Sequence, residues 1–449
     1  MSENPDKIET KINFSSSSFK KYLANTSWLF LERILRIIIS FVVVIYVVRY
    51  LGPKDFGLYS YVLSFTWLFV AISTLGLETI SVREIVKQPQ KKDEIIGTVF
   101  TLRILGGIAA IILIGLTLII SHEDIYISIL ILIASTAFIF QSFSVIEYYF
   151  RASVKAKYNA YALSASVVFS SALKIILILI EAPLLYFIAA FTFEYFVLAI
   201  GLVAVYKGNK YKILNWKYSK LLARSLLKDS WPLALSGVVV MIYMKIDQVM
   251  IKYMIDEEAV GFYAAAVRLC EAWYFIPVTI CNSIFPAIVN SKNVSEEFYS
   301  NRLQKLYDLL AWLAIGIAVP VTFLSHEIIY ILYGSEFAPA APVLTIYIWA
   351  GVAVFLAVAS SQYLVNENLT KLLFLRTLVG MIINVSLNLI LIPVYGIVGS
   401  AIATLVSYTA VTFALSFHNK YYSQFKMMLR SVFGISAFGY FIKKPDRGG

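Results

Sequence analysis

The chain has 449 residues, of which 60% are hydrophobic and only 14% are charged, and its formal net charge is +11. A water-soluble protein has no core large enough for that share of apolar side chains, so the composition excludes a soluble globular class. Runs of about 20 apolar residues match the roughly 30 Å hydrocarbon layer of a membrane. Because lipid offers backbone amides no partner, these runs predict transmembrane helices.

The first 27 residues are polar, contain a run of serines and lack the pattern of a cleavable signal, so we expect an unstructured cytoplasmic arm. Twelve apolar runs follow. The predicted spans cover residues 28–48, 58–80, 98–120, 125–146, 161–181, 184–206, 231–251, 262–288, 307–332, 341–364, 371–392 and 397–417.

The two halves of the chain repeat one another. An offset of 203 residues aligns Trp28 with Trp231, and an offset of 204 aligns Gly57 with Gly261. Transporters commonly bind their substrate between two such repeats. We therefore predict an all-α integral membrane protein with twelve helices, arranged as two pseudo-symmetric six-helix bundles around a central cavity. Its predicted parts are an arm (1–27), an N-terminal bundle (28–206), a linker (207–230), a C-terminal bundle (231–417) and a cytoplasmic tail (418–449).

Basic residues are distributed unevenly between the two sides of the membrane. Of the 38 Lys and Arg residues, 28 lie in the termini and in the loops of one side, whereas only Arg49, Lys54 and Lys252 lie on the other. Positively charged loops stay in the cytoplasm, so both termini are predicted to be cytoplasmic in a multi-pass protein of the cell membrane. The excess of positive charge is thus a signal of membrane topology, carried by loops that lie beside anionic lipid headgroups. Nucleic acid is therefore not an expected partner.

Several basic residues remain inside the predicted spans. A charge at mid-membrane costs roughly 2.5–3.5 kcal/mol on insertion scales, so it usually faces a wet interior. Arg33 and Arg36 share one face of the first span, Lys174 lies well inside the fifth, and Arg268 lies in the eighth. These four residues predict a positively charged cavity. Because arginine binds phosphate oxygens through two parallel donors, we expect a diphosphate-linked substrate.

Other interpretations of the charges in the spans stay open. Glu271 follows Arg268 by three residues, so a local ion pair is an alternative to a substrate role. Four further charged residues lie near predicted span ends, where snorkelling or structural pairing explains them: Arg103, Glu78, Glu147 and Arg376.

A possible site for a coupling ion involves Asp247 in the seventh span. The eleventh and twelfth spans each offer two polar residues at i, i+4 spacing, and such oxygen ligands suit a hard cation such as Na⁺. Asp247 alone can instead carry a proton, and hydrogen bonding between packed helices is the common alternative use of these side chains. The predicted site consists of Asp247, Asn384, Asn388, Ser400 and Thr404.

Four stretches of the chain carry a family resemblance. They are YVVRYLGPKDFGLYSYVLSFTWLFVAISTLGLETISVREI (46–85), KIDQVMIKYMIDEEAVGFYAAAVRLCEAWYFIPVTICNSIFPAI (245–288), ILYGSEFAPAAPVL (331–344) and NVSLNLILIPVYGIVGSAIATLVSY (384–408). In a duplicated frame of spans, these motifs make the chain similar to the polysaccharide transporter family of Wzx-type oligosaccharide flippases. That family is part of the multidrug/oligosaccharidyl-lipid/polysaccharide exporter superfamily.

The resemblance implies a transporter and not an enzyme. Such proteins move polyprenyl-diphosphate-linked oligosaccharides, for example O-antigen units, across the membrane by alternating access for surface polysaccharide biosynthesis. Membrane lipids, a polysaccharide polymerase and glycosyltransferases are the implied partners. Related lipid II flippases hold the diphosphate with arginines of spans one and eight, which correspond to Arg33, Arg36 and Arg268. Those flippases bind Na⁺ between spans seven, eleven and twelve. In place of one carboxylate of their pattern this chain has Asn388, which weakens the expectation of tight Na⁺ binding.

Two other functions compete with this interpretation. A multidrug or organic-cation antiporter of the same superfamily would have an acidic lumen. The first span of this chain instead contains two arginines together with Glu32. A membrane polymerase or ligase predicts a large extracytoplasmic loop, which the chain lacks. No nucleotide-binding loop occurs, and the three histidines lie far apart, so no cofactor or metal is expected apart from Na⁺ or H⁺ as a coupling ion.

Overall fold

The structure is a computed structural model that describes residues 16–367, 369–413 and 422–434, with side chains described from Glu32 onward except for Arg33. All regular structure in these residues is helical. Ten continuous helical stretches in the described ranges are long and apolar enough to cross a membrane. The predicted all-α membrane fold is confirmed, whereas twelve crossings stay a prediction.

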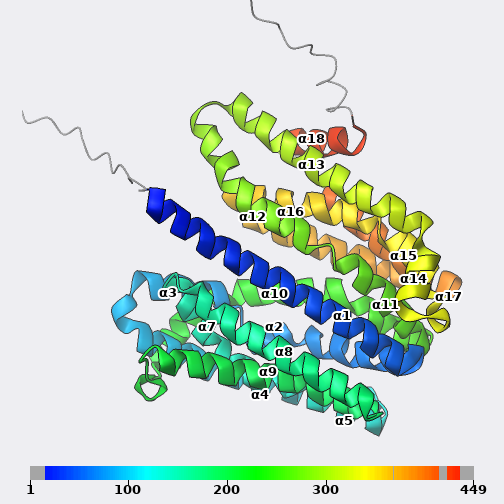
Figure 1. The fold of residues 1–449 in the computed structure, drawn as a ribbon, viewed down its shortest axis with the longest axis horizontal. Helices are drawn as coiled ribbons and strands as arrows, with labels where there is room; N and C mark the ends of the chain where they lie inside the picture. The colour runs from blue at the N-terminus through cyan, green and yellow to red at the C-terminus, as the bar shows by residue number, and fades with distance from the viewer. Residues whose placement is uncertain (1–15, 368, 414–421, 435–449) are drawn as a thin grey trace, which may run out of the picture.

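The helices form two groups that are stacked on one another in Figure 1. The first group contains α1 (Ser16–Leu68), α2 (Val70–Thr74), α3 (Leu77–Lys87), α4 (Lys92–Ile120), α5 (Ile125–Ser135), α6 (Ala137–Gln141), α7 (Val145–Ala152), α8 (Ala156–Leu179) and α9 (Leu184–Gly208). The second contains α10 (Lys220–Met254), α11 (Glu257–Glu271), α12 (Phe275–Asn290), α13 (Glu296–Phe323), α14 (Ser325–Tyr333), α15 (Ala340–Tyr347), α16 (Ala350–Asn366), α17 (Thr370–Phe413) and α18 (Tyr422–Val432). We call these groups the N-terminal and C-terminal lobes.

Two of the ten apolar stretches turn back on themselves. α1 leaves helical geometry at Gly52 (φ 67°) and α17 at Gly396 (φ 58°), positive angles that glycine adopts without strain. Asn384 Nδ2 lies 3.4 Å from Thr404 Oγ1, although twenty residues of straight helix would separate them by about 30 Å. Division of α1 and α17 at these glycines gives twelve segments.

Two helices begin earlier than the apolar pattern indicates. α1 begins at Ser16, within the arm predicted to be unstructured, and α10 begins at Lys220, within the predicted linker. The side chain of Ser219 caps α10 by accepting from the Leu222 amide at 3.4 Å. Apolarity marks only the part of a helix that lies in lipid, and the backbone hydrogen bonds continue into polar sequence. Residues 1–15 of the arm lie outside the described residues, and the domain boundaries stay a prediction.

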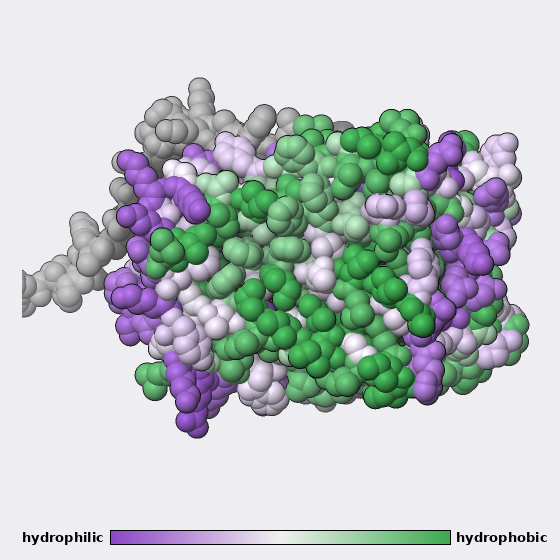
Figure 2. Space-filling model, turned by 90° about the horizontal axis from the view of Figure 1, so that it is seen from below, coloured by the Kyte–Doolittle hydropathy of each residue, from purple (hydrophilic) through white to green (hydrophobic). Residues whose placement is uncertain are grey.

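The surface has the banded pattern of a membrane protein. Apolar side chains form a broad belt across the long axis of the molecule, and hydrophilic side chains gather at both ends (Figure 2). The start of α1 and the end of α9 lie at one end, which the basic loops predict to be cytoplasmic (left in Figure 1). The bends within α1 and α17 lie at the opposite end (right in Figure 1), which we call the hairpin end.

The two lobes come closest near the hairpin end, where α1 crosses α11. A Cβ atom at Gly57 would lie 1.7 Å from the carbonyl oxygen of Glu257, and one at Gly261 would lie 2.0 Å from the carbonyl oxygen of Pro53. Only glycine permits such an approach of two backbones. Gly57 and Gly261 are also the pair that the internal repeat aligns, so the repeat places its own two copies in contact.

Gly261→Ala is expected to destabilise the contact between the lobes. The added methyl group has no room against backbone atoms, and overpacking of this kind costs about 1–3 kcal/mol. Gly316→Ala in α13 is the matched control, because nothing lies within 4 Å of its Cβ position. We expect only Gly261→Ala to lower the unfolding temperature of the detergent-purified protein, and equal temperatures for the two variants would contradict the contact.

Candidate functional site

A polar cavity of about 170 Å³ lies between the lobes, close to the Gly57–Gly261 contact. Helices α1, α10 and α11 form its walls, and the Asp256 side chain starts α11 by capping the Ala259 amide at 2.8 Å. We call it the interlobe cavity. Its lining residues are Tyr59, Ser60, Leu63, Ser64, Trp67, Lys245, Gln248, Ala264, Val267, Arg268 and Glu271.

The interlobe cavity carries a surplus of positive charge. Lys245 Nζ lies 3.8 Å from Glu271 Oε2, so Glu271 pairs across helices with Lys245. The alternative interpretation, a local ion pair between Arg268 and Glu271, is therefore wrong. No carboxylate of the described residues forms an ion pair with Arg268. Two cations and one carboxylate therefore line the cavity, which favours an anionic ligand.

The structure does not gather all four residues of the predicted cationic cavity. Arg36 lies 3.2 Å from Glu32 within α1, and Lys174 lies 3.1 Å from Glu194 on the neighbouring helix α9. Neither residue lines the interlobe cavity, and the side chain of Arg33 lies outside the described residues. Of the predicted residues whose side chains the structure describes, Arg268 alone lines this cavity, where Lys245, which was not predicted, joins it.

All five residues of the predicted ion site come together between α10 and α17. Asn388 Nδ2 and Thr404 Oγ1 each donate to the Asp247 carboxylate at 2.7 Å, and Asn384 and Ser400 lie one helical turn before Asn388 and Thr404. The cluster has one further member that was not predicted, Tyr263 of α11, whose hydroxyl donates to Asp247 at 2.8 Å. Binding of an ion by this buried cluster stays a prediction.

The ion cluster retains unused oxygen atoms. Asn388 Oδ1 and Ser400 Oγ are buried and have no hydrogen-bond partner among the described residues. Buried polar groups without partners cost free energy, so two such atoms beside one carboxylate fit a small cation bound by oxygen ligands. No group of three or more His, Cys, Asp or Glu side chains that could hold a metal occurs in the described part of the chain, so the fit rests on neutral oxygens and Asp247 alone.

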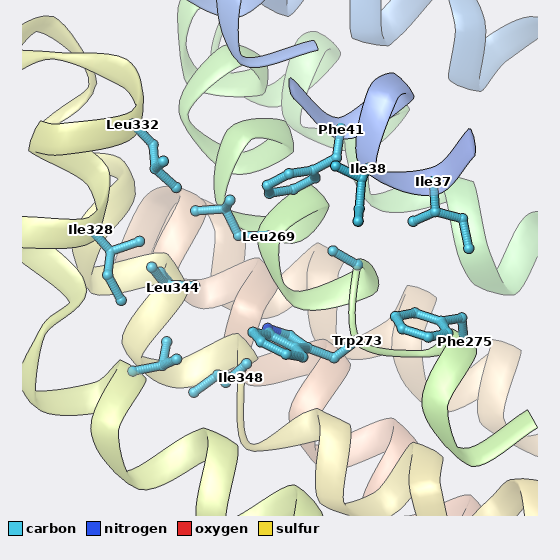
Figure 3. Close-up of a pocket in the computed structure, with 12 residues that line it drawn as sticks. Ile37, Ile38, Phe41, Leu269, Trp273, Phe275, Ile328, Leu332, Leu344 and Ile348 are labelled. Carbon is cyan, nitrogen blue, oxygen red and sulfur yellow. The ribbon is translucent and has the colours of Figure 1, made fainter. Parts of the chain in front are cut away.

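An apolar groove of about 470 Å³ opens between α1 and the C-terminal lobe (Figure 3). Arg268 lines the interlobe cavity, whereas the next residue, Leu269, lines the groove, so the end of α11 separates the two spaces. In Figure 3 the labelled side chains converge from α1, from the α11–α12 junction and from α14 and α15. The groove is lined by Ile37, Ile38, Phe41, Leu269, Ala272, Trp273, Phe275, Val321, Ile328, Leu332, Leu344 and Ile348.

A cluster of polar residues joins the lobes at the hairpin end. Glu123 follows α4 in the N-terminal lobe and accepts from Lys252 of α10 at 2.6 Å and from the Tyr61 hydroxyl of α1 at 2.9 Å, and Tyr253 also donates to it. Burial would raise the pKa of the Glu123 carboxyl, but the hydrogen bonds from Lys252, Tyr253 and Tyr61 outweigh it and hold that pKa below its usual value. We call these four residues the Glu123 cluster.

Two arginines near predicted span ends do not snorkel to the surface. Arg103 is 2% exposed and donates to Ser144 Oγ at 2.5 Å, and Arg376 is 7% exposed and donates to Ser361 Oγ at 2.7 Å. The snorkelling interpretation is therefore wrong for both, and structural pairing holds. Glu78 forms an ion pair with Arg151.

Curated proteins and solved structures resemble this chain. A 208-residue segment is 30% identical to the "Probable low-salt glycan biosynthesis flippase Agl15" of Haloferax volcanii, and covers 45% of this chain and 43% of that protein. The match thus spans less than half of the curated relative.

The fold matches known transporters along nearly its whole length. A structure described as "Lipid II flippase MurJ, inward closed conformation" gives a TM-score of 0.70 at 17% identity, covering 93% of this chain and 94% of that one. An inward-facing multidrug resistance MATE family transporter of the MOP superfamily gives a TM-score of 0.65 at 12% identity, covering 90% and 96%. At these identities the likeness concerns the fold alone.

The family model described as "Polysaccharide biosynthesis protein" matches residues 22–292, from α1 to the end of α12 and just beyond. Because this match covers more than half of the 449 residues, the chain belongs to the polysaccharide biosynthesis protein family.

Proposed function

We propose that this protein is a flippase that moves polyprenyl-diphosphate-linked oligosaccharides across the cell membrane for surface polysaccharide biosynthesis. Membership of the family and a relative named as a probable glycan biosynthesis flippase support this proposal. Glycosyltransferases would assemble its substrate on one side, and a polymerase would use it on the other.

One observation carries the proposal, namely the position of Arg268 between two unlike spaces. On one side of α11 lies a cavity with surplus positive charge, and on the other lies a groove lined by apolar side chains. A lipid with an anionic headgroup and a hydrocarbon chain matches both spaces at once, because guanidinium groups bind phosphate oxygens and apolar surface binds the chain.

An organic-cation antiporter is the alternative function. Such a protein would hold its substrate with carboxylates, but the only carboxylate that lines the interlobe cavity, Glu271, is paired with Lys245. The lining therefore favours the flippase.

Arg268→Ala is expected to abolish transport without loss of the protein from the membrane. The lost charged hydrogen bonds are worth about 1.5–3 kcal/mol, which corresponds to a roughly 10- to 100-fold weaker interaction with the diphosphate. In a deletion strain of the source cell, the wild-type gene should restore surface polysaccharide and clear accumulated lipid-linked glycan. Arg302→Ala, a change of an exposed arginine on α13, is the control and should also restore both. Normal polysaccharide with Arg268→Ala at equal protein level would reject the role of Arg268.

We further propose that the Asp247 cluster binds the coupling ion, and that this ion is Na⁺. Asp247, Asn388 Oδ1 and Ser400 Oγ would hold it, with Asn384 and Thr404 beside them. When bound, Na⁺ would supply the free energy of its gradient to transport.

Na⁺ is expected to raise the unfolding temperature of the wild-type protein, because a ligand that binds only the folded state stabilises it by about 2.7 kcal/mol at one hundred times its Kd. Asp247→Asn should remove this effect, whereas Asp55→Asn, a change of an exposed carboxylate, should retain it. The measurement compares NaCl with choline chloride at one ionic strength. Stabilisation by acid pH without any effect of Na⁺ would reassign the cluster to a proton.

Alternating access requires the hairpin end to open, so the Glu123 cluster has to break during transport. With a lowered pKa, Glu123 is ionised at neutral pH, and its contribution to the contact between the lobes is fully present above the usual Glu pKa of about 4.3. That contribution is lost as the pH falls through the lowered value.

Glu123→Gln should open the hairpin end at pH 7, where the wild type stays closed. Spin labels on Ile125→Cys and Tyr395→Cys, both exposed and at this end, report the distance between the lobes, and the two native cysteines are buried. We expect a longer distance in Glu123→Gln and no change in Glu181→Gln, a change of an exposed carboxylate at the same end. Identical distance distributions in Glu123→Gln and the wild type would show that the cluster does not hold the lobes together.

A further inference from the structure

A second polar cavity, of about 230 Å³, lies inside the N-terminal lobe. It shares one residue with the interlobe cavity, Trp67 at the end of α1. Its other walls come from α2, α3, α4, α9 and the stretch from α6 to α7. We call it the N-lobe cavity, and its lining residues are Trp67, Val70, Thr74, Glu78, Arg103, Phe140, Gln141, Ser144, Glu147, Tyr148, Tyr195, Leu198 and Leu202.

One wall of the N-lobe cavity is fixed, and another carries polar groups without protein partners. Arg103 is anchored by Ser144 and Tyr148. The Glu147 carboxyl and the Gln141 side-chain amide, by contrast, have no hydrogen bond or ion pair with any other residue in the described ranges. Polar groups at membrane depth cost free energy when unpaired, so these two are available for the hydroxyl groups of a ligand.

Aromatic rings stand beside these polar groups. The rings of Trp67 and Tyr195 lie 6.4 Å apart at 63°, and Phe140 lines the same space. A sugar ring has an apolar C–H face, which packs on aromatic surface, and a rim of hydroxyls, which pairs with carboxylate and amide groups. A volume below the roughly 300–1,000 Å³ of drug-sized ligand sites fits a single sugar residue and not a whole oligosaccharide.

The charge of the cavity favours a neutral ligand over a cation. Glu78 is already paired with Arg151, so Glu147 faces a space that also contains the guanidinium group of Arg103. The cavity therefore has no surplus of negative charge, which suits a polyhydroxyl group better than a cationic drug.

We propose that the N-lobe cavity binds one sugar residue of the lipid-linked glycan, with Glu147 and Gln141 as its hydrogen-bonding partners and Trp67 at the junction with the diphosphate. This assignment rests on the proposed flippase function. It places the diphosphate at Arg268, the hydrocarbon chain in the apolar groove and the sugar in the N-terminal lobe.

The test uses the full-length protein in lipid nanodiscs and titration calorimetry. The probes are farnesyl diphosphate and synthetic conjugates of it with single hexoses and N-acetylhexosamines. At least one conjugate should bind tenfold more tightly than farnesyl diphosphate itself. Glu147→Gln and, independently, Gln141→Ala should remove that gain and leave the binding of farnesyl diphosphate unchanged. Glu297→Gln, which alters an exposed carboxylate of α13, should keep the gain.

The outcomes separate the sugar site from the flippase function. Equal affinities for farnesyl diphosphate and all conjugates, or a gain that survives both substitutions, would overturn the sugar site. If farnesyl diphosphate fails to bind, the flippase proposal is contradicted. The sugar site is then tested with methyl glycosides, which have to bind to the wild type and fail to bind to Glu147→Gln. Binding of tetraphenylphosphonium that depends on Glu147 would assign the cavity to cations and overturn the sugar assignment.

Discussion

A charged side chain inside the apolar belt has to pair with another group or face a cavity, because the hydrocarbon layer does not solvate charge. Several charged residues of the described helices meet that constraint through ion pairs. Lys174 with Glu194 joins two helices of one lobe, and Lys252 with Glu123 joins the two lobes. Among the arginines that line a cavity, Arg268 is different, since it has no ion pair or side-chain hydrogen bond with another described residue, whereas Arg103 is anchored by Ser144 and Tyr148. That exception makes it the residue on which a functional interpretation can rest.

The two ends of the molecule differ in how closely the lobes approach one another. At the hairpin end the lobes are held by the Gly57–Gly261 backbone contact and by the Glu123 cluster, which fills the interface with hydrogen bonds. Toward the other end the helices of the C-terminal lobe diverge from those of the N-terminal lobe (Figure 1). The interlobe cavity adjoins this contact, since Tyr59 and Ala264, which lie two and three residues after Gly57 and Gly261, line it.

Three spaces of different chemistry meet around the end of α1 and the end of α11. An apolar groove, a cationic cavity and a polar, aromatic cavity share walls at Trp67 and at the step from Arg268 to Leu269. A lipid-linked glycan consists of the same three chemistries in the same order. The arrangement therefore supports the proposal that one lipid-linked glycan is held across all three spaces.

The sequence by itself determined the class of fold, the internal repeat and the shared helix faces of Asn384 with Asn388 and of Ser400 with Thr404. Apolar runs and i, i+4 spacing are local patterns, and a helix converts them directly into spans and shared faces. It did not determine which charges are neutralised: Lys174, expected in the cavity, pairs with Glu194, and Glu271 pairs with Lys245 and not with Arg268. The meeting of Asp247 with α17, the contacts of Tyr263 and Glu123, and the separation of the groove from the two cavities were likewise decided only by the tertiary structure. They depend on how helices distant in the chain are rotated and stacked against one another.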